Sequence, residues 1–249
     1  MINFDTAEKL GNKFGIDAYS VVREYVQIVF LNELYSLKDT NKIVFKGGTM
    51  LRLMFGSNRF SEDLDFSTSM DEKRLEKILS ETMIQIAKQI PSVELKRLVT
   101  KVGYSWKIFV GWDGSSQKLT VKLDFSPREV VWRIKQGVIT TELPVSSTRL
   151  VTYMDLEEVL AEKVRAIQSR EKGRDIYDLW YLLNRGVKFD WELVQKKMDY
   201  YGEKITQDLL KSLISGWDQK KLDQDVRRFL PLKDRPVLDK IKELILEKI

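Results

Sequence analysis

The sequence predicts an α/β fold, in which a small mixed sheet with flanking helices is followed by a helical C-terminal half. Up to about residue 150, amphipathic helical patterns alternate with short runs rich in β-branched and aromatic residues. Beyond that point the apolar residues recur with helical spacing only. With 249 residues, 43% of them hydrophobic, the chain can bury a core. We therefore expect two domains, at residues 1–150 and 151–249.

The first elements are helices. Residues 1–16 predict a short helix and a turn, with Gly11 and Gly15 as breakers. Residues 17–38 carry a broad apolar stripe, which indicates a helix that belongs to the core.

A strand, a glycine turn and a short helix follow. The apolar run at residues 43–45 predicts a buried strand that breaks at Gly47 and Gly48. Thr49 can then cap a helix over residues 50–55. The N–H groups of the glycines and of the helix N-terminus would point to one place, which is an arrangement that binds phosphate.

Two acids come next, on a predicted strand. Because side chains alternate along a strand, Asp63 and Asp65 would share one face while Leu64 and Phe66 anchor the other face in the core. Two negative charges about 6 Å apart repel by about 3 kcal/mol at an effective dielectric near 20. A divalent cation removes that cost, so the pair beside a phosphate-binding turn indicates Mg²⁺ or Mn²⁺ with a nucleoside triphosphate.

Each motif has an ordinary explanation when it stands alone. A Gly-Gly pair is usually a turn, and an Asp-x-Asp pair is usually a solvated strand end. Their combination in this order, with a spacer the size of a helix, favours a functional site.

A helix and three strands are expected after the acids. Residues 71–90 form an amphipathic pattern that Pro91 stops. The strand candidates, with a hairpin turn at Asp113-Gly114 between the last two, are residues 93–99, 104–112 and 118–125. We take Asp124 of the last strand as a third acid, although a charged residue at a strand end also explains it, since alternation puts Lys122 on the same face.

The rest of the chain changes character. Residues 126–153 predict irregular structure or a short strand near residues 138–145. Helices follow at residues 154–169, with Asp155 as cap, at 176–184, and near 191–200, 205–215, 222–229 and 237–248.

Lys163 and Arg170 lie seven residues apart and share a helix face, where a cation could reach a phosphate. Taken alone, Lys163 could equally be solvated, and Asp175 could be a helix cap.

Composition excludes some chemistry. The chain lacks Cys and His, which excludes disulfides, thiolate metal sites and imidazole as a general base. A net charge of +5, from 42 basic and 37 acidic residues, permits a nucleic-acid partner without requiring one. No apolar run is long enough for a membrane span, and Asp5 and Glu8 do not fit a signal peptide, so we expect a cytoplasmic protein.

The motifs together resemble a known family, the nucleotidyltransferases of the AbiEii/AbiGii toxin type within the DNA polymerase β-like superfamily. The resemblance rests on five segments in the family's order: KGGT at 46–49, RFSEDLDF at 59–66, KLDFSPRE at 122–129, LAEKVRA at 160–166 and GRDIYDLW at 173–180. It implies a nucleotidyltransferase-like domain whose active site also receives residues from the helical domain.

The resemblance also implies roles for single residues. Asp124 would complete the metal site of Asp63 and Asp65 or accept the proton of the attacking hydroxyl. Lys163 and Asp175 would be carried into the active site from the helical part, with Arg174 and Asp178 orienting it. The nucleotide-binding candidates are Lys46, Gly47, Gly48, Thr49, Arg59, Ser61 and Arg174. The chain departs from the superfamily pattern at Thr49, where Ser is common, and at the charged Lys46.

The activity that the resemblance implies is Mg²⁺-dependent transfer of a nucleoside monophosphate from a triphosphate to RNA, with the tRNA 3′ end as acceptor. The enzyme would be the toxin half of a toxin–antitoxin or phage-defence pair, with an antitoxin as possible partner. Two alternatives stay open: transfer of AMP to a protein hydroxyl, and a catalytically silent relative that binds nucleic acid or a partner.

Overall fold

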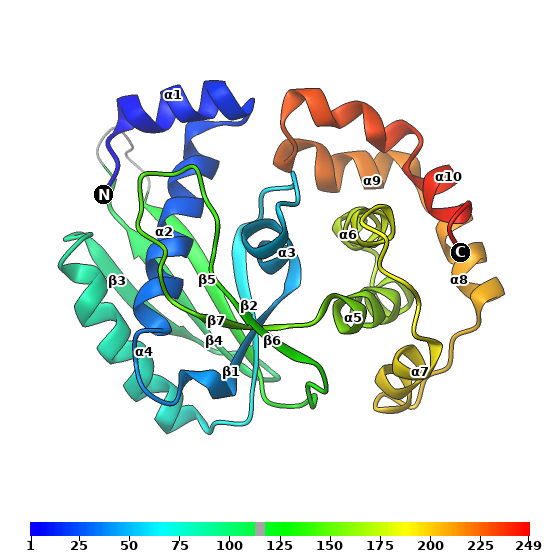
Figure 1. Cartoon of the computed structure of the whole chain (residues 1–249), viewed down its shortest axis with the longest axis horizontal. Helices are drawn as coiled ribbons and strands as arrows, with labels where there is room; N and C mark the ends of the chain where they lie inside the picture. Colours follow the sequence, from blue (N-terminus) through cyan, green and yellow to red (C-terminus); the bar gives the residue numbers. More distant parts are fainter. Residues whose placement is uncertain (113–117) are drawn as a thin grey trace. The chain divides into compact units, whose positions relative to one another are not determined.

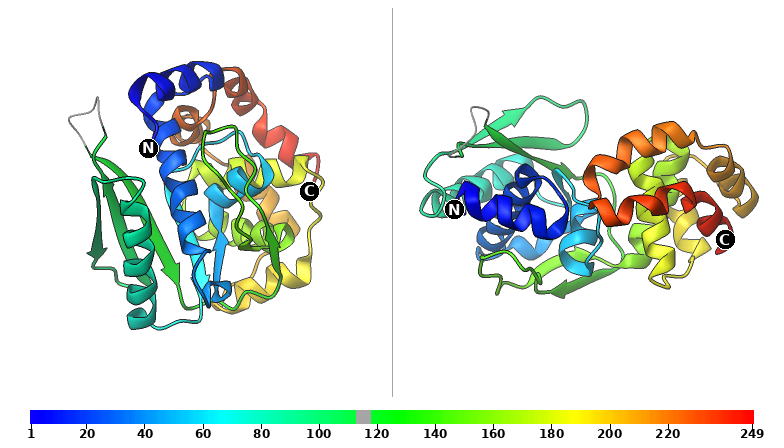
Figure 2. Two further views of the ribbon diagram at one scale, coloured as in Figure 1. Left: turned by 60° about the vertical axis from the view of Figure 1, so that its left-hand side comes forward. Right: turned by 90° about the horizontal axis from the view of Figure 1, so that it is seen from above.

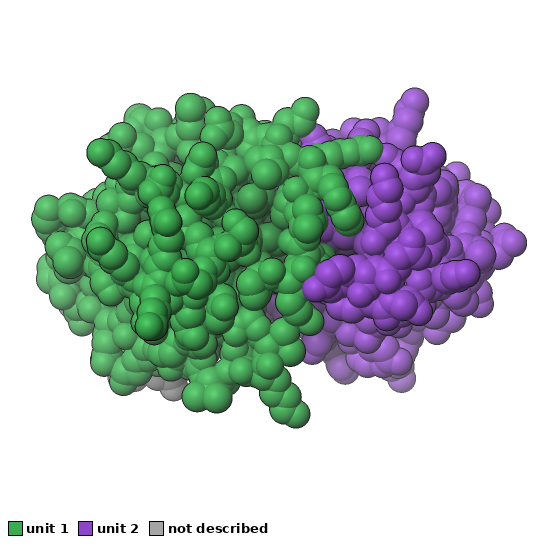
Figure 3. All heavy atoms as spheres, turned by 90° about the horizontal axis from the view of Figure 1, so that it is seen from below, with its two compact units in different colours: residues 1–56, 60–153 green, residues 57–59, 154–249 purple. Residues whose placement is uncertain are grey.

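The computed structural model describes residues 1–112 and 118–249, and the hairpin turn predicted at Asp113-Gly114 lies outside these residues. The chain forms two compact units, coloured separately in Figure 3. The first consists of Met1–Gly56 and Phe60–Tyr153, and the second of Ser57–Arg59 and Met154–Ile249.

The first unit contains a mixed sheet of seven strands in the order β3-β4-β5-β2-β1-β7-β6 (Figure 1). β1 pairs antiparallel with β2 and parallel with β7, while β2 pairs parallel with β5, so the predicted mixed α/β class is confirmed. The strands are β1 (Ile43–Lys46), β2 (Asp63–Thr68), β3 (Val93–Leu98), β4 (Tyr104–Val110), β5 (Leu119–Ser126), β6 (Ile134–Gly137) and β7 (Val151–Met154).

Four helices belong to this unit: α1 (Phe4–Phe14), α2 (Ala18–Leu34), α3 (Gly47–Phe55) and α4 (Glu72–Ala87). Asp17 and Asp71 cap α2 and α4 by accepting hydrogen bonds from the N–H groups of Ser20 and Arg74. α2 packs on β5, and α4 packs on α2 and β3 (Figure 2). These two long helices therefore cover one face of the sheet.

The core of this unit lies between that face and α2. Phe66 stacks on Phe125 with ring centroids 4.8 Å apart and also contacts Phe30 of α2 and Phe45 of β1. Because side chains alternate along each strand, the residues between these aromatic anchors point to the opposite face of the sheet.

The second unit is helical among its described residues. Its helices are α5 (Leu156–Ser169), α6 (Gly173–Asn184), α7 (Trp191–Asp199), α8 (Gln207–Ser215), α9 (Gln219–Val226) and α10 (Ile241–Leu246), with short 3₁₀ segments η2 (Arg227–Phe229) and η3 (Leu232–Asp239). Asp155 caps α5 as predicted. α6 packs on α5, α9 and α10, and a Cβ atom at Gly173 would lie 2.9 Å from the backbone of Leu222 in α9. Glycine at the start of α6 permits this close packing.

Two details differ from the prediction. Of the two alternatives for residues 126–153, irregular structure holds at 138–145, while short strands lie at β6 and β7 instead. The Val145 N–H donates a hydrogen bond to the Leu143 carbonyl oxygen after Pro144, which closes a tight turn there. The last helix begins at Ile241 rather than 237, since Pro236 lies in the 3₁₀ segment η3. No helix among the described residues has the length and apolar character that crossing a bilayer requires.

Candidate active site

Three carboxylates share the sheet face opposite α2. Asp65 of β2 lies directly opposite Asp124 of β5 in the strand register, and Asp63 lies opposite Lys122. Adjacent strands are about 4.8 Å apart, so the side chains of each pair are neighbours. The predicted alternation holds, since Leu64 is fully buried while Asp63 and Asp65 are partly exposed.

Lys122 lies among these acids. Its Nζ atom is 2.7 Å from Oδ2 of Asp124, whose other oxygen accepts a hydrogen bond from the Ser105 hydroxyl. Burial alone would lower the pKa of Lys122, but the hydrogen bond to Asp124 and the charges of Asp124, Asp63 and Asp65 outweigh burial and raise the pKa. The three carboxylates therefore act together on one positive charge.

The glycine turn lies against the same acids. Lys46 is opposite Asp65 in the β1–β2 register, and α3 begins at the next residue. Gly47 has a φ of +81°, and a Cβ atom there would lie 2.4 Å from Oδ2 of Asp65. Only glycine accommodates both the backbone conformation and the carboxylate. The N-terminus of α3, with its N–H groups, thus begins beside Asp65.

Thr49 does not cap α3 as the sequence suggested. The helix begins three residues earlier than expected, at Gly47, with Lys46 at the cap position and no side-chain cap. The buried Thr49 hydroxyl instead donates a hydrogen bond to the Asp63 carbonyl oxygen. This bond ties α3 to the first residue of β2, so Thr49 links the glycine turn to the acid pair.

The loop before β2 is held by α2. Gln27 donates a hydrogen bond of 3.0 Å to the Ser61 carbonyl oxygen, and Arg23 forms an ion pair of 3.2 Å with Glu62. Arg52 of α3 pairs with the carboxylate of Glu24. The first two contacts hold the segment in which the candidate nucleotide-binding residue Ser61 lies, and the third joins α3 to α2.

The other candidate residues lie in the second unit, in a buried charge cluster. Lys163 is 8% exposed, and its Nζ atom lies 2.8 Å from Oδ1 of Asp175 and 2.7 Å from Oδ2 of Asp178. Arg59 forms a bidentate pair with Asp178, donating from Nε to Oδ1 at 3.0 Å and from Nη2 to Oδ2 at 2.9 Å. Arg170, the residue that shares a face with Lys163, lies with its Nε atom 2.9 Å from Asp175.

The charges of this cluster set its protonation. Burial opposes charge on Asp175, but the ammonium of Lys163 and the guanidinium of Arg170 outweigh it and hold the Asp175 pKa well below its usual range. Burial likewise lowers the Lys163 pKa, and the charges of Asp175 and Asp178 more than reverse this effect. The alternatives of a solvated Lys163 and a capping Asp175 are wrong, because Lys163 is buried and Asp175 lies inside the first turn of α6.

Two charged contacts of the second unit were not predicted. Arg59 and Asp178 are separated by 119 positions in the chain, and no local pattern pairs them. Lys197 of α7 is buried with its Nζ atom 2.7 Å from Glu158 of α5.

Arg174, a nucleotide-binding candidate, places its guanidinium 5.5 Å from the ring centre of Phe229.

Comparison with known proteins identifies the family. The family model described as nucleotidyl transferase AbiEii toxin, type IV toxin–antitoxin system, matches residues 29–243. The chain belongs to this family. It is therefore a nucleotidyltransferase of the toxin–antitoxin class, as the motifs predicted.

Solved structures of similar fold agree with this assignment. MenT4, a nucleotidyltransferase toxin from Mycobacterium tuberculosis, aligns with 100% of this chain and 91% of its own at 18% identity, with a TM-score of 0.67. JHP933 from Helicobacter pylori aligns with 94% of each chain at 20% identity, with a TM-score of 0.53. At these identities the likeness shows the fold. No curated protein sequence matches the chain.

The three carboxylates of this AbiEii-family enzyme provide the type of ligand atom, oxygen, that a divalent cation such as Mg²⁺ binds. Hard oxygen ligands are those that Mg²⁺ prefers, and Asp63, Asp65 and Asp124 already act on one cation, the Lys122 ammonium. Among the described residues, no group of three or more Asp, Glu, His or Cys side chains is arranged so that protein ligands alone could hold a metal ion. Mg²⁺ usually keeps several waters and binds one or two carboxylates together with substrate phosphates, so the donor set fits.

Proposed function

We propose that this nucleotidyltransferase transfers a nucleoside monophosphate from a nucleoside triphosphate to an RNA acceptor, with the tRNA 3′ end as the first candidate. The observation that carries the proposal is the meeting of Asp65, Asp124 and the Gly47 turn on one face of the sheet. An antitoxin protein is the partner that membership of a toxin–antitoxin family suggests.

The first unit would hold the triphosphate. Asp63, Asp65 and Asp124 would bind Mg²⁺, which neutralises charge on the phosphates and polarises them when it is bound. The N–H groups at the start of α3, from Gly47 and Gly48, would donate hydrogen bonds to phosphate oxygens. The acids and the helix terminus would thus position the α-phosphorus for attack.

The reaction forms one bond and breaks one. The acceptor hydroxyl oxygen bonds to the α-phosphorus, the bond from that phosphorus to the bridging oxygen breaks, and pyrophosphate leaves. Asp124 is the proposed acceptor of the hydroxyl proton, held in place by Lys122 and Ser105. Lys163 and Asp175 of the second unit remain proposed active-site residues, with Lys163 neutralising developing charge.

A labelling assay tests the proposal. Purified protein is incubated with Mg²⁺, each α-labelled nucleoside triphosphate in turn and total RNA, and the label is followed into RNA and into protein. We expect label in RNA, and loss of at least a hundredfold in Asp65→Ala, as is typical when a catalytic charge is removed. Asp199→Ala, a change at the end of α7, is the matched control and should label normally. Label that survives Asp65→Ala, or that enters protein alone, refutes the proposal.

A further inference from the structure

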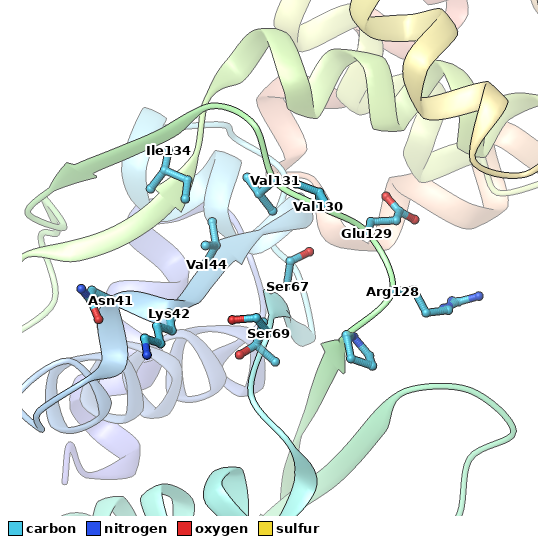
Figure 4. Close-up of a pocket in the computed structure, with 12 residues that line it drawn as sticks. Asn41, Lys42, Val44, Ser67, Ser69, Arg128, Glu129, Val130, Val131 and Ile134 are labelled. Carbon is cyan, nitrogen blue, oxygen red and sulfur yellow. The ribbon is translucent and has the colours of Figure 1, made fainter.

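A pocket of about 360 Å³ opens on the sheet face that carries the acids. It lies between the first residues of β1, the end of β2 and the segment that leads from β5 to β6 (Figure 4). Val44 of the pocket is opposite Ser67 in the β1–β2 register, and two residues further along β1 Lys46 is opposite Asp65. Two residues of strand span roughly 6.5 Å, so the pocket adjoins the acids directly.

The lining of the pocket combines apolar walls with polar groups. Val44, Val131 and Ile134 supply apolar surface, and the charged lining residues are Lys42, Arg128 and Glu129. Such a mixture is typical of sites that bind small organic ligands, whose volumes begin at about 300 Å³. The pocket therefore has the size and chemistry for one nucleoside next to a phosphate.

Ser67 points to the same conclusion. Its side chain lies on the face of β2 that carries Asp63 and Asp65, and it is 1% exposed. Among the described residues its hydroxyl has no hydrogen-bond partner. A buried hydroxyl without a partner is unfavourable, so a polar ligand group that hydrogen-bonds to Ser67 in the pocket would stabilise it.

The order of features along β1 indicates whether the pocket binds the nucleoside of the triphosphate or that of the acceptor. Going from Val44 to Gly47, the chain passes the pocket, then the acids opposite Lys46, then the turn proposed to bind phosphate. In-line displacement requires the attacking oxygen and the leaving group on opposite sides of the phosphorus. With pyrophosphate leaving beside Gly47, the attacking hydroxyl comes from the side of Val44.

We propose that this pocket binds the terminal nucleoside of the RNA acceptor and presents its hydroxyl to the acids. Lys42 and Arg128 lie on different sides of the pocket (Figure 4), where each attracts the phosphate backbone of the RNA. The inference rests on the proposed function and adds to it a place for the acceptor, which favours nucleic acid over a protein hydroxyl.

Filling the pocket tests the inference. Ile134 is 49% exposed, so Ile134→Trp can fill the pocket from its rim, and Arg128→Gln removes a charge without adding volume. For both variants we expect KM for total RNA to rise about tenfold, the equivalent of about 1.4 kcal/mol. KM for the nucleoside triphosphate should stay within about twofold, because the pocket lies away from the phosphate turn. Ile84→Trp, at an exposed position of α4 outside the pocket, is the matched control and should leave both KM values unchanged.

The experiments distinguish failure of the acceptor pocket from failure of the proposed function. If the wild type labels RNA and Asp65→Ala does not, the function stands whatever the pocket variants do. Unchanged KM for RNA in both variants, or a raised KM for the triphosphate instead, overturns the acceptor pocket alone. Absence of RNA labelling by the wild type overturns both proposals.

Discussion

At the level of single residues, Lys122 reduces the repulsion between three neighbouring carboxylates. Its ammonium pairs with Asp124 at 2.7 Å and also interacts with Asp63 and Asp65. A divalent cation at these acids would have to compete with this ammonium, because both are attracted by the same oxygens. Lys122 therefore acts as an internal cation whose removal should favour the metal.

Replacing Lys122 by Met tests this role. We expect Lys122→Met to bind Mn²⁺ about three- to tenfold more tightly than the wild type, because about 1 kcal/mol of competing attraction is removed. Titration followed by electron paramagnetic resonance measures free Mn²⁺ directly. Lys107→Met removes the same charge from the adjacent position of β4 and controls for long-range electrostatics. Equal affinities in the two variants, or weaker binding in Lys122→Met, would show that the ammonium does not compete.

Asp175 should stabilise the second unit in a pH-dependent way. Removing one partner of a buried ion pair costs about 3–5 kcal/mol, so Asp175→Asn should lower Tm at pH 7 by roughly 6–20 °C. The folded pKa of Asp175 is depressed, so its contribution is fully present above the unfolded pKa of about 3.9 and decreases as the pH falls below that value.

Thermal melts of wild type and Asp175→Asn between pH 7 and pH 3 measure this effect. The difference in Tm should be constant down to about pH 4 and should narrow below it. Arg170→Gln is the control at the exposed edge of the cluster, and it should cost about 1 kcal/mol or less. A difference that widens on acidification would contradict the assigned charge state.

At the level of elements, the turn from β1 into α3 joins the strand to the acids. Gly47 and Gly56 both have positive φ, at +81° and +78°, but only Gly47 has a neighbour where a Cβ atom would stand. Alanine at Gly56 meets only backbone strain, whereas alanine at Gly47 must also displace the Asp65 carboxylate. The two glycines thus form a matched pair.

We expect Gly56→Ala to lose about 1–2 kcal/mol of stability and to keep nucleotide binding. Gly47→Ala should lose a similar amount or more, and the rise in Tm on adding triphosphate and Mg²⁺ should disappear. Differential scanning fluorimetry with and without ligand measures both effects. A normal ligand-induced shift in Gly47→Ala would mean that the phosphate turn has been placed wrongly.

The alternation of side chains along β2 predicts which face carries Asp63 and Asp65. The residue at which α3 begins could not be predicted in the same way. Alternation of acids with Leu64 and Phe66 places the acids correctly because one face of β2 is fully buried. The start of α3 was placed too late because Gly-Gly indicates a turn, and only the contact between Gly47 and Asp65 shows why glycine begins a helix here. β7 has four residues, too few for a pattern to emerge.

At the level of the whole molecule, one short segment belongs to a different compact unit from the residues on either side of it in the sequence. Residues Ser57–Arg59 follow α3 in sequence but belong to the second unit, where Arg59 pairs with Asp178. A sequence pattern records neighbours a few positions apart, so it cannot show a pairing across 119 positions. The family motifs named both segments as functional, and the buried ion pair is the physical link between them.

The central claim is that Asp63, Asp65 and Asp124 hold a metal-bound triphosphate at the Gly47 turn. Diffraction from crystals grown with Mn²⁺ and a non-hydrolysable triphosphate, collected at the manganese absorption edge, tests it most directly. We predict an anomalous peak about 2.1 Å from oxygens of these carboxylates, with triphosphate oxygens bound by N–H groups at the start of α3. Manganese bound elsewhere, or a triphosphate held away from Gly47, would contradict the claim.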